Sequence, residues 1–485
     1  MDCSGTFSFR YLRLGLIGIF VAGGAWTGSS PYGQADASAR DVVLAQTPAI
    51  PPLSADDVSL LFPAPTREED FAKLIAVRDL TTQDPDPSKR DVVWTNAVFK
   101  QFIAIANGAQ GQVAGTTSHI GLPVEVQSID SWFIAGIRID AGAPGLSSDI
   151  RGQFGQSPEI RLIVQPVTRN ADGTPHVHDI AGHLILDFLT GLDAPAQADC
   201  LPRPKPDLDA FKAIVTDLVV LKAKLSNGQL GADKVLTDGL PLGVHPGLAD
   251  TTTAANLRQE IKLFLERHIS NLRLNAMAIA GVPDGKPEPW IFLSMRNLSG
   301  TVTAVHGPTL DGQQFAELLE PSGASFQVVP QPHTNNLNPI TCKNAVVSTT
   351  SLPVVNRAGD ATADVFVNPP LDDDKTRAIL DVIADPIKGH FFNTDCVNCH
   401  TETRRTMELP NFKNIPGIDT TALPKDSWNV RNFGWSPAGG LQATVTRRTA
   451  SETAAVVAFI NSELIGKQAV PQYRITDLSG ERTER

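Results

Sequence analysis

The 485-residue chain has fewer basic than acidic residues, with 41 Lys and Arg against 52 Asp and Glu and a formal net charge of −11. Nucleic-acid-binding proteins and polybasic membrane-surface proteins carry a basic face, so this balance argues against both classes. The chain also lacks a glycine-rich phosphate loop, a G-x-S-x-G nucleophile elbow and an H-E-x-x-H zinc motif. A docking partner with a basic patch would be attracted by this charge.

Long apolar runs are scarce, and the one at residues 14–25, LGLIGIFVAGGA, is too short to span a bilayer. Arg10 and Arg13 precede it, and Ala35 and Ala37 follow as a small-residue cleavage site. This order predicts a signal peptide over residues 1–37 and a periplasmic or otherwise exported protein, with no stable membrane span after its removal. An uncleaved membrane anchor is the alternative.

Cysteines are also few, and Cys3 would leave with the signal peptide. An exported protein folds in a compartment that permits disulfides. If Cys396 and Cys399 are occupied by another group, Cys200 and Cys342 are the pair that remains, and we expect them to form a disulfide. Two separate buried thiols are the alternative.

The hydrophobic pattern predicts an α+β fold with a β-rich region at residues 91–368. Residues 38–90 read as a linker with short helices, capped by Ser54 and Thr66. Helical spacing of apolar residues predicts helices over 206–225 and 252–269. Short runs of alternating or β-branched residues predict strands within 130–142, 159–167, 182–189, 272–282, 289–297 and 300–307.

Residues 369–470 are predicted to form a small all-α domain, followed by a polar tail at 471–485. Asp373 or Asp374 is expected to cap a helix that ends before Pro386. Thr449 and Glu452 have the spacing of a capping box at the start of the last helix.

The sequence Cys396-Val397-Asn398-Cys399-His400 has the C-x-x-C-H pattern of covalent c-type haem attachment. Two cysteines one helical turn apart can form thioether bonds to the two vinyl groups on one edge of a porphyrin. The histidine that follows can then ligate the iron. The motif therefore predicts one covalently bound haem c, with Cys396 and Cys399 as anchors and His400 as the proximal iron ligand.

Three other uses of this motif fit the chain less well, and one of them, a structural disulfide across C-x-x-C, is strained. A redox dithiol of this spacing is usually found at a helix start in a thioredoxin-like βαβ pattern, which does not surround residues 396–399. A zinc site needs two further ligands at short spacing, and no Cys or His follows His400 in the chain.

Around the motif, residues 370–470 resemble the class I c-type cytochrome domain: a helix, the C-x-x-C-H element, a loop-rich middle and a C-terminal helix. The resemblance implies a small α-helical fold around one haem with an exposed edge for electron exchange. The segment WNVRNFGW at 428–435 is similar to part of the dihaem cytochrome c peroxidases. Because the chain has a single C-x-x-C-H, the dihaem scheme does not carry over. The N-terminal region resembles no family that we recognise.

The class I resemblance implies a methionine as sixth iron ligand, and Met407 is the methionine that follows the motif. Seven extended residues span at most ~25 Å, which reaches round the porphyrin edge only if the segment is not helical. Two alternatives stay open: an open, five-coordinate iron, or a ligand donated from upstream, for which the candidates are His306, His333, His390 and Met295.

Two further groups of polar residues are candidates for a role. Arg404 and Arg405, like Arg447 and Arg448, could pair with haem propionates or form a solvated face. His176, His178 and His183 stand close together in the sequence HVHDIAGH, where His176 and His178 would share one face of a strand. A metal site and plain surface histidines are both compatible with that spacing.

These observations favour a one-electron carrier rather than an enzyme. One alternative is a peroxidase-like haem enzyme with an open distal site. The other is a binding module or oxidoreductase subunit whose haem serves the N-terminal region.

Overall fold

The computed structural model describes the chain between residues 51 and 466 with gaps. The described residues are 51–83, 86–113, 116–119, 122–143, 145, 151, 155–194, 203–249, 252–281, 291–305, 320–321, 372–389, 396–425, 431–437 and 440–466. The predicted signal peptide and polar tail lie outside them. So do Cys200 and Cys342 of the predicted disulfide.

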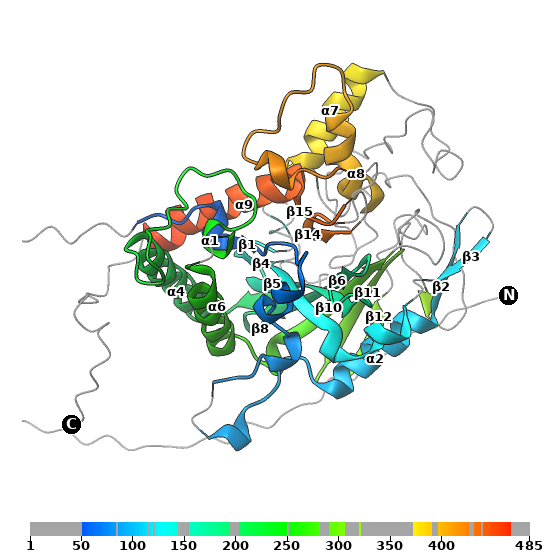
Figure 1. The fold of residues 1–485 in the computed structure, drawn as a ribbon, viewed down its shortest axis with the longest axis vertical. Coiled ribbons are helices and arrows are strands. Elements are labelled where there is room, and N and C mark those ends of the chain that lie inside the picture. Colours follow the sequence, from blue (N-terminus) through cyan, green and yellow to red (C-terminus); the bar gives the residue numbers. More distant parts are fainter. Residues whose placement is uncertain are drawn as a thin grey trace, which may run out of the picture. The chain divides into compact units, whose positions relative to one another are not determined.

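An eight-stranded antiparallel sheet forms the centre of the fold (Figure 1). Its order is β1-β4-β5-β7-β10-β11-β12, with β6 paired to β5. All six predicted strand segments belong to this sheet. The bounds are β1 (Ser59–Leu61), β4 (Trp132–Asp140), β5 (Glu159–Arg169), β6 (Pro175–Val177), β7 (Ile180–Asp187), β10 (Leu274–Gly281), β11 (Ile291–Leu298) and β12 (Thr301–Val305).

The two faces of the sheet differ in chemistry, because successive side chains of a strand point to opposite sides. One face, here the apolar face, carries Ile137, Leu162, Leu184, Met277, Ile279, Leu293 and Met295, all buried. The strand register places polar and charged residues together on the opposite side. We call it the polar face and define it by Arg138, Glu159, Arg161, Gln165, His183 and Asp187.

Aromatic packing joins helix α2 (Asn96–Gly108) to the apolar face. The ring of Trp94 lies 5.7 Å from that of Trp132 on β4, and 4.9 Å and 5.1 Å from those of Phe99 and Phe102 on α2. Edge-to-face contacts of this kind stabilise beyond the apolar area that they bury. Helix α2 also contacts β11 and β12, so it covers that end of the sheet.

The two predicted helices form as α4 (Leu208–Ser226) and α6 (Ala254–His268), which pack against each other. Their predicted apolar stripes are buried, with the exception of Leu208, which is 41% exposed at the first turn of α4. The shorter elements are α5 (Pro246–Ala249), β2 (Ala109–Val113), β3 (Thr116–His119), β8 (Leu189–Asp193), β9 (Arg203–Pro206), β13 (Glu320–Pro321), η1 (Glu68–Lys73), η2 (Val77–Asp79), η3 (Pro87–Lys89), η4 (Val124–Gln127), η5 (Ile129–Ser131), η6 (Asn271–Arg273) and η7 (Thr420–Ala422).

The described part of residues 38–90 is core rather than linker. Leu61 is fully buried in β1, and Leu53 and Leu80 are buried as well. Ser54 is the N-cap of α1 (Ala55–Val58), as predicted. Thr66 caps no helix: its backbone N–H instead donates to Asp70 within the turn that follows. The proline and aspartate content of this stretch therefore does not reflect a linker.

The C-terminal part contains α7 (Asp373–Ala384), α8 (Cys396–Met407), the hairpin β14 (Phe433–Ser436) and β15 (Gln442–Val445), and α9 (Arg447–Phe459), extended by a π-helical turn at Ile460–Ile465. The hairpin means that this part is not all-α. Two predicted caps are wrong by a few residues. Asp372 caps α7 by accepting from Lys375 N, and Thr446 caps α9 by accepting from Thr449 N.

The predicted boundary at residue 369 does not separate two cores. Residues 50–485 group into one compact unit, and one apolar core extends from Leu53 to Leu464. Leu380, Ile383 and Leu409 form a small separate cluster. The fold thus combines helices and sheet, with a β-rich N-terminal part and a C-terminal part that packs against it.

The hairpin of β14 and β15 docks on the polar face of the sheet. The side chain of Gln165 on β5 forms two hydrogen bonds with the backbone of Trp435: its Nε2 donates to the carbonyl oxygen (2.8 Å), and its Oε1 accepts from the N–H (2.6 Å). Gly434 lies directly against Gln165, where an added Cβ would be 2.7 Å from Oε1. This contact leaves no room for a side chain at residue 434.

The close approach at Gly434 gives a first prediction. Gly434 and Gly440 both have positive φ, +152° and +108°, but a Cβ at Gly440 would meet nothing within 4 Å. Both alanine variants incur backbone strain, and only Gly434→Ala adds a clash. Urea denaturation should show a loss of unfolding free energy for Gly434→Ala that exceeds that of Gly440→Ala by about 1–3 kcal/mol. Equal losses would contradict the docking described.

Candidate haem site

The C-x-x-C-H motif opens helix α8, which begins at Cys396. Helical periodicity places positions 396, 399 and 400 on one face within the first turn and a half. Cys399 and His400 are both partly buried. The backbone therefore has the arrangement that two thioether bonds and a proximal imidazole require.

Glu402 and Thr403, which follow the motif by two and three residues, fix α8 against the start of α9. Glu402 is fully buried, and its carboxylate accepts from the backbone N–H of Arg448 (3.0 Å) and from Nε of Arg447 (3.1 Å). Thr403 Oγ1 accepts from the backbone N–H of Arg447 (2.8 Å). A carboxylate is stabilised at a helix N-terminus by the exposed N–H groups and the helix dipole. We call this arrangement the Glu402 clamp.

Arg448 extends the clamp in two directions. Its Nη1 donates to the carbonyl oxygens of Ile383 (2.9 Å) and Gly389 (2.6 Å), at the end of α7 and in the turn after it. Its Nε donates to Glu452 one turn along α9 (2.9 Å). Its positive charge also acts on the thiol of Cys399. One guanidinium thus ties together α7, α9 and the haem motif.

Glu452 connects this network to the sheet. Its carboxylate accepts from Arg138 of the polar face (3.0 Å). Burial acts to raise the pKa of Glu452, but Arg448, Arg138 and Arg161 outweigh it and lower the pKa to about 2. A second link lies further along the chain, where Arg431 pairs with Asp179 (2.6 Å) just before β7. The helix that carries His400 is therefore anchored to the polar face through α9, while the segment before β14 is anchored at Asp179.

His183 of β7 lies on the polar face between these anchors. Burial lowers its pKa to about 3, so the imidazole is neutral at physiological pH. Arg161, Arg138 and Arg431 act on it as positive charges, and His400 also interacts with it. The two propionates of a haem are anionic, so the residues around His183 and His400 fit that group in charge.

The hydrogen bonding of Arg138 supports the same fit. Its Nη2 donates to Glu452, but its buried Nε has no hydrogen-bond partner among the described residues. A buried donor of this kind normally has a partner. An acceptor supplied by a bound group on this face would satisfy it.

The candidates for the sixth iron ligand lie in different parts of the structure. Residues 400–407 are helical, so Met407 lies about 10 Å further along the same helix as His400. The extended segment that Met407 would need is absent, and Met407 packs against the apolar core instead. Met295 is 1% exposed and points to the apolar face, away from the haem motif. His306, His333 and His390 lie outside the described residues.

The arginines considered for the propionates have protein partners. Arg404 and Arg405 both approach Glu408, at 3.5 Å and 3.6 Å. Arg447 pairs with Asp381 and Glu402, and Arg448 with Glu452. The arginines that act electrostatically on His183 are Arg138, Arg161 and Arg431, which are also paired with carboxylates, and no local motif marks them in the sequence.

The histidines of HVHDIAGH divide into two groups. His176 and His178 share one side of β6 and its end, with rings 4.5 Å apart, as predicted. His178 hydrogen-bonds to Thr168 (2.8 Å), while His183 lies on the next strand. Among the described residues there is no group of three or more His, Cys, Asp or Glu that could hold a metal ion.

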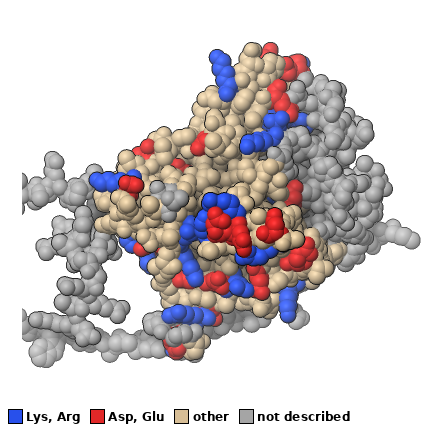
Figure 2. Space-filling model, in the orientation of Figure 1, with Lys and Arg blue, Asp and Glu red and all other residues tan. Residues whose placement is uncertain are grey.

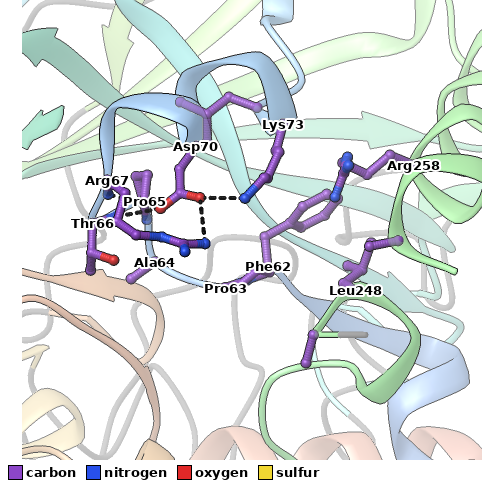
Figure 3. A pocket seen from close by; sticks show the side chains of 13 residues that line it. Phe62, Pro63, Ala64, Pro65, Thr66, Arg67, Asp70, Lys73, Leu248 and Arg258 are labelled. Carbon is purple, nitrogen blue, oxygen red and sulfur yellow. Dashed lines mark hydrogen bonds and ion pairs between the residues drawn. The ribbon is translucent and has the colours of Figure 1, made fainter. Parts of the chain in front are cut away.

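A separate pocket of about 440 Å³ lies between residues 62–74 and helices α5 and α6 (Figure 3). Phe62, Leu248 and Arg258 line it, and Asp70 bridges Lys73 and Arg67 at its rim. None of the C-x-x-C-H residues or polar-face residues lines this pocket. It is thus distinct from the candidate haem site.

Comparison with known proteins finds no match: no family model, no curated protein and no solved structure matches the chain. Within the described ranges, no helix has both the length and the apolar character to cross a membrane.

The depressed pKa of Glu452 gives a second prediction. A carboxyl with a folded pKa of about 2 and an ordinary value of 4.5 stabilises the fold above pH 4.5, and this contribution is lost as the pH falls towards 2. Denaturation of the full-length protein should show Glu452→Gln destabilised by roughly 2–3 kcal/mol near pH 6, with the difference from wild type shrinking towards pH 2. The exposed Glu463 provides a control, Glu463→Gln. A difference that does not depend on pH would rule out the charge network.

Proposed function

We propose that the protein is an exported c-type cytochrome that carries one covalently bound haem and transfers single electrons. The observation that carries the proposal is the C-x-x-C-H motif at the start of a helix whose position is fixed by the buried Glu402 clamp. A proximal histidine on a rigidly held helix keeps the metal environment constant, which favours electron exchange with little reorganisation.

Each part of the site has a role in this function. The haem, when bound, supplies the Fe(III)/Fe(II) couple. Cys396 and Cys399 anchor it, and His400 provides the proximal nitrogen. Arg138 and Arg161 of the polar face supply positive charge on the side towards His183, where the propionates would be stabilised. The N-terminal sheet is then one wall of the haem site.

Electron transfer requires a partner, and the net charge of −11 favours a redox protein with a basic docking face. On the face seen in Figure 2, basic and acidic side chains are interspersed rather than separated by sign. The attraction in this proposal therefore comes from the net charge of the chain and not from an acidic patch on that face.

A peroxidase-like enzyme is the second candidate, and the helical conformation of residues 400–407 favours it to some extent. Because Met407 does not reach across the porphyrin, the distal position is open unless another side chain occupies it. An open iron binds peroxide and carbon monoxide, whereas a six-coordinate iron excludes them.

Covalent attachment is testable with cysteine variants. After export in a host with a cytochrome c maturation system, the denatured wild-type protein should have the mass of the chain plus one haem. Cys396→Ala/Cys399→Ala should lose the haem on denaturation, because both thioether bonds are gone. Met407→Leu is the control and should retain the haem, because residue 407 forms no bond to it. A wild-type chain without haem would refute the proposal.

A further inference from the structure

His183 is on the same face of the sheet as the residues that anchor the haem helix. The strand register pairs His183 with Ile163 of β5 and Ala278 of β10. Paired residues of neighbouring strands point to the same side of a sheet. In the same way, Arg161 of β5 pairs with Arg138 of β4, two positions along from Ile163. His183 therefore points to the side on which Arg138 meets Glu452 of α9.

His183 and His400 interact electrostatically, and the helix of His400 is held to this side of the sheet by the contacts of Glu402 and Glu452. Contacts at two separate places on the sheet hold the C-terminal part to it. Arg138 joins β4 to α9, and α9 is clamped to the helix of His400 by Glu402. Arg431 pairs with Asp179, four residues before His183. Several independent contacts thus hold the C-terminal part against the side of the sheet that carries His183.

The hydrogen bonding of His183 differs from that of the other interior histidines. His178 bonds to Thr168, and His268 to Asp217. The ring of His245 accepts from a nearby backbone N–H. No described residue forms a hydrogen bond with the ring of His183, which is partly buried. The ring is therefore available to a ligand on this face.

We propose that His183 supplies the sixth iron ligand, opposite His400. This inference rests on the proposed function and names the residue that completes its metal site. Met407 lies along the helix of His400, and Met295 points to the apolar face, so neither competes for this position. Two histidine ligands give a low-spin, six-coordinate iron that excludes peroxide and small gases. The site is then a carrier, and its two ligands come from opposite halves of the chain.

The test uses the full-length, haem-loaded protein and three substitutions. The oxidised wild type should have a low-spin visible and electron paramagnetic resonance spectrum, and its reduced form should not bind carbon monoxide. His183→Ala should become high-spin and bind carbon monoxide, and added imidazole should restore the low-spin spectrum. His176→Ala, which changes an exposed histidine on β6, the strand before that of His183 in the chain, is the matched control and should retain the wild-type spectrum.

His183→Met keeps a ligand and covers the case in which the alanine variant does not fold. Replacing an axial imidazole by a thioether raises the reduction potential of a c-type haem, so the potential should rise relative to wild type. A covalently bound haem whose spectrum and potential are unaffected at residue 183, or a high-spin wild type, overturns this inference and leaves the proposed function standing. A wild type without covalent haem overturns both.

Discussion

The buried carboxylate of Glu402 is the constraint on which the rest of the site depends. It lies one turn after the haem motif's first residues and is fully buried, so its charge has to be compensated within the protein. Compensation comes from the N-terminus of α9 and from Arg447. From there the charges continue through Arg448 and Glu452 to the sheet. Removing one member of such a network leaves another charge buried and unpaired, so its members are positioned together.

This network explains why the C-terminal part does not form a domain of its own. A small cytochrome domain normally encloses its haem with its own helices, but here apolar residues of α9 and Met407 of α8 belong to the core of the sheet. The polar face would be costly to bury without compensating charges. The proposed haem, with its propionates and its need for two axial ligands, accounts for both the unsatisfied Nε of Arg138 and the unbonded imidazole of His183 on that face.

Local patterns in the sequence were sufficient for the strands and the long helices, and they placed C-x-x-C-H within one helical turn. Alternation and helical spacing depend on neighbouring residues, and C-x-x-C-H depends on one helical turn. Caps were displaced by a few residues, because Asp372, Asp373 and Asp374 are chemically equal and only the geometry selects one.

The side of the candidate site that the sheet forms depends on strand register, which local sequence patterns do not predict. In the sequence His183 stands with His176 and His178, yet the turn after β6 places it on another strand. Its electrostatic interaction with His400 links residues more than two hundred positions apart in the chain. Glu402 was missed for a similar reason, since its partners follow the hairpin of β14 and β15.

The most direct test of this account is the position of the iron. An anomalous-difference map from crystals of the haem-loaded protein, recorded on both sides of the iron absorption edge, locates that atom without reference to the rest of the electron density. The account predicts one peak between His400 and the polar face, with His183 on its far side. A peak on the solvent side of α8, remote from the sheet, would contradict it.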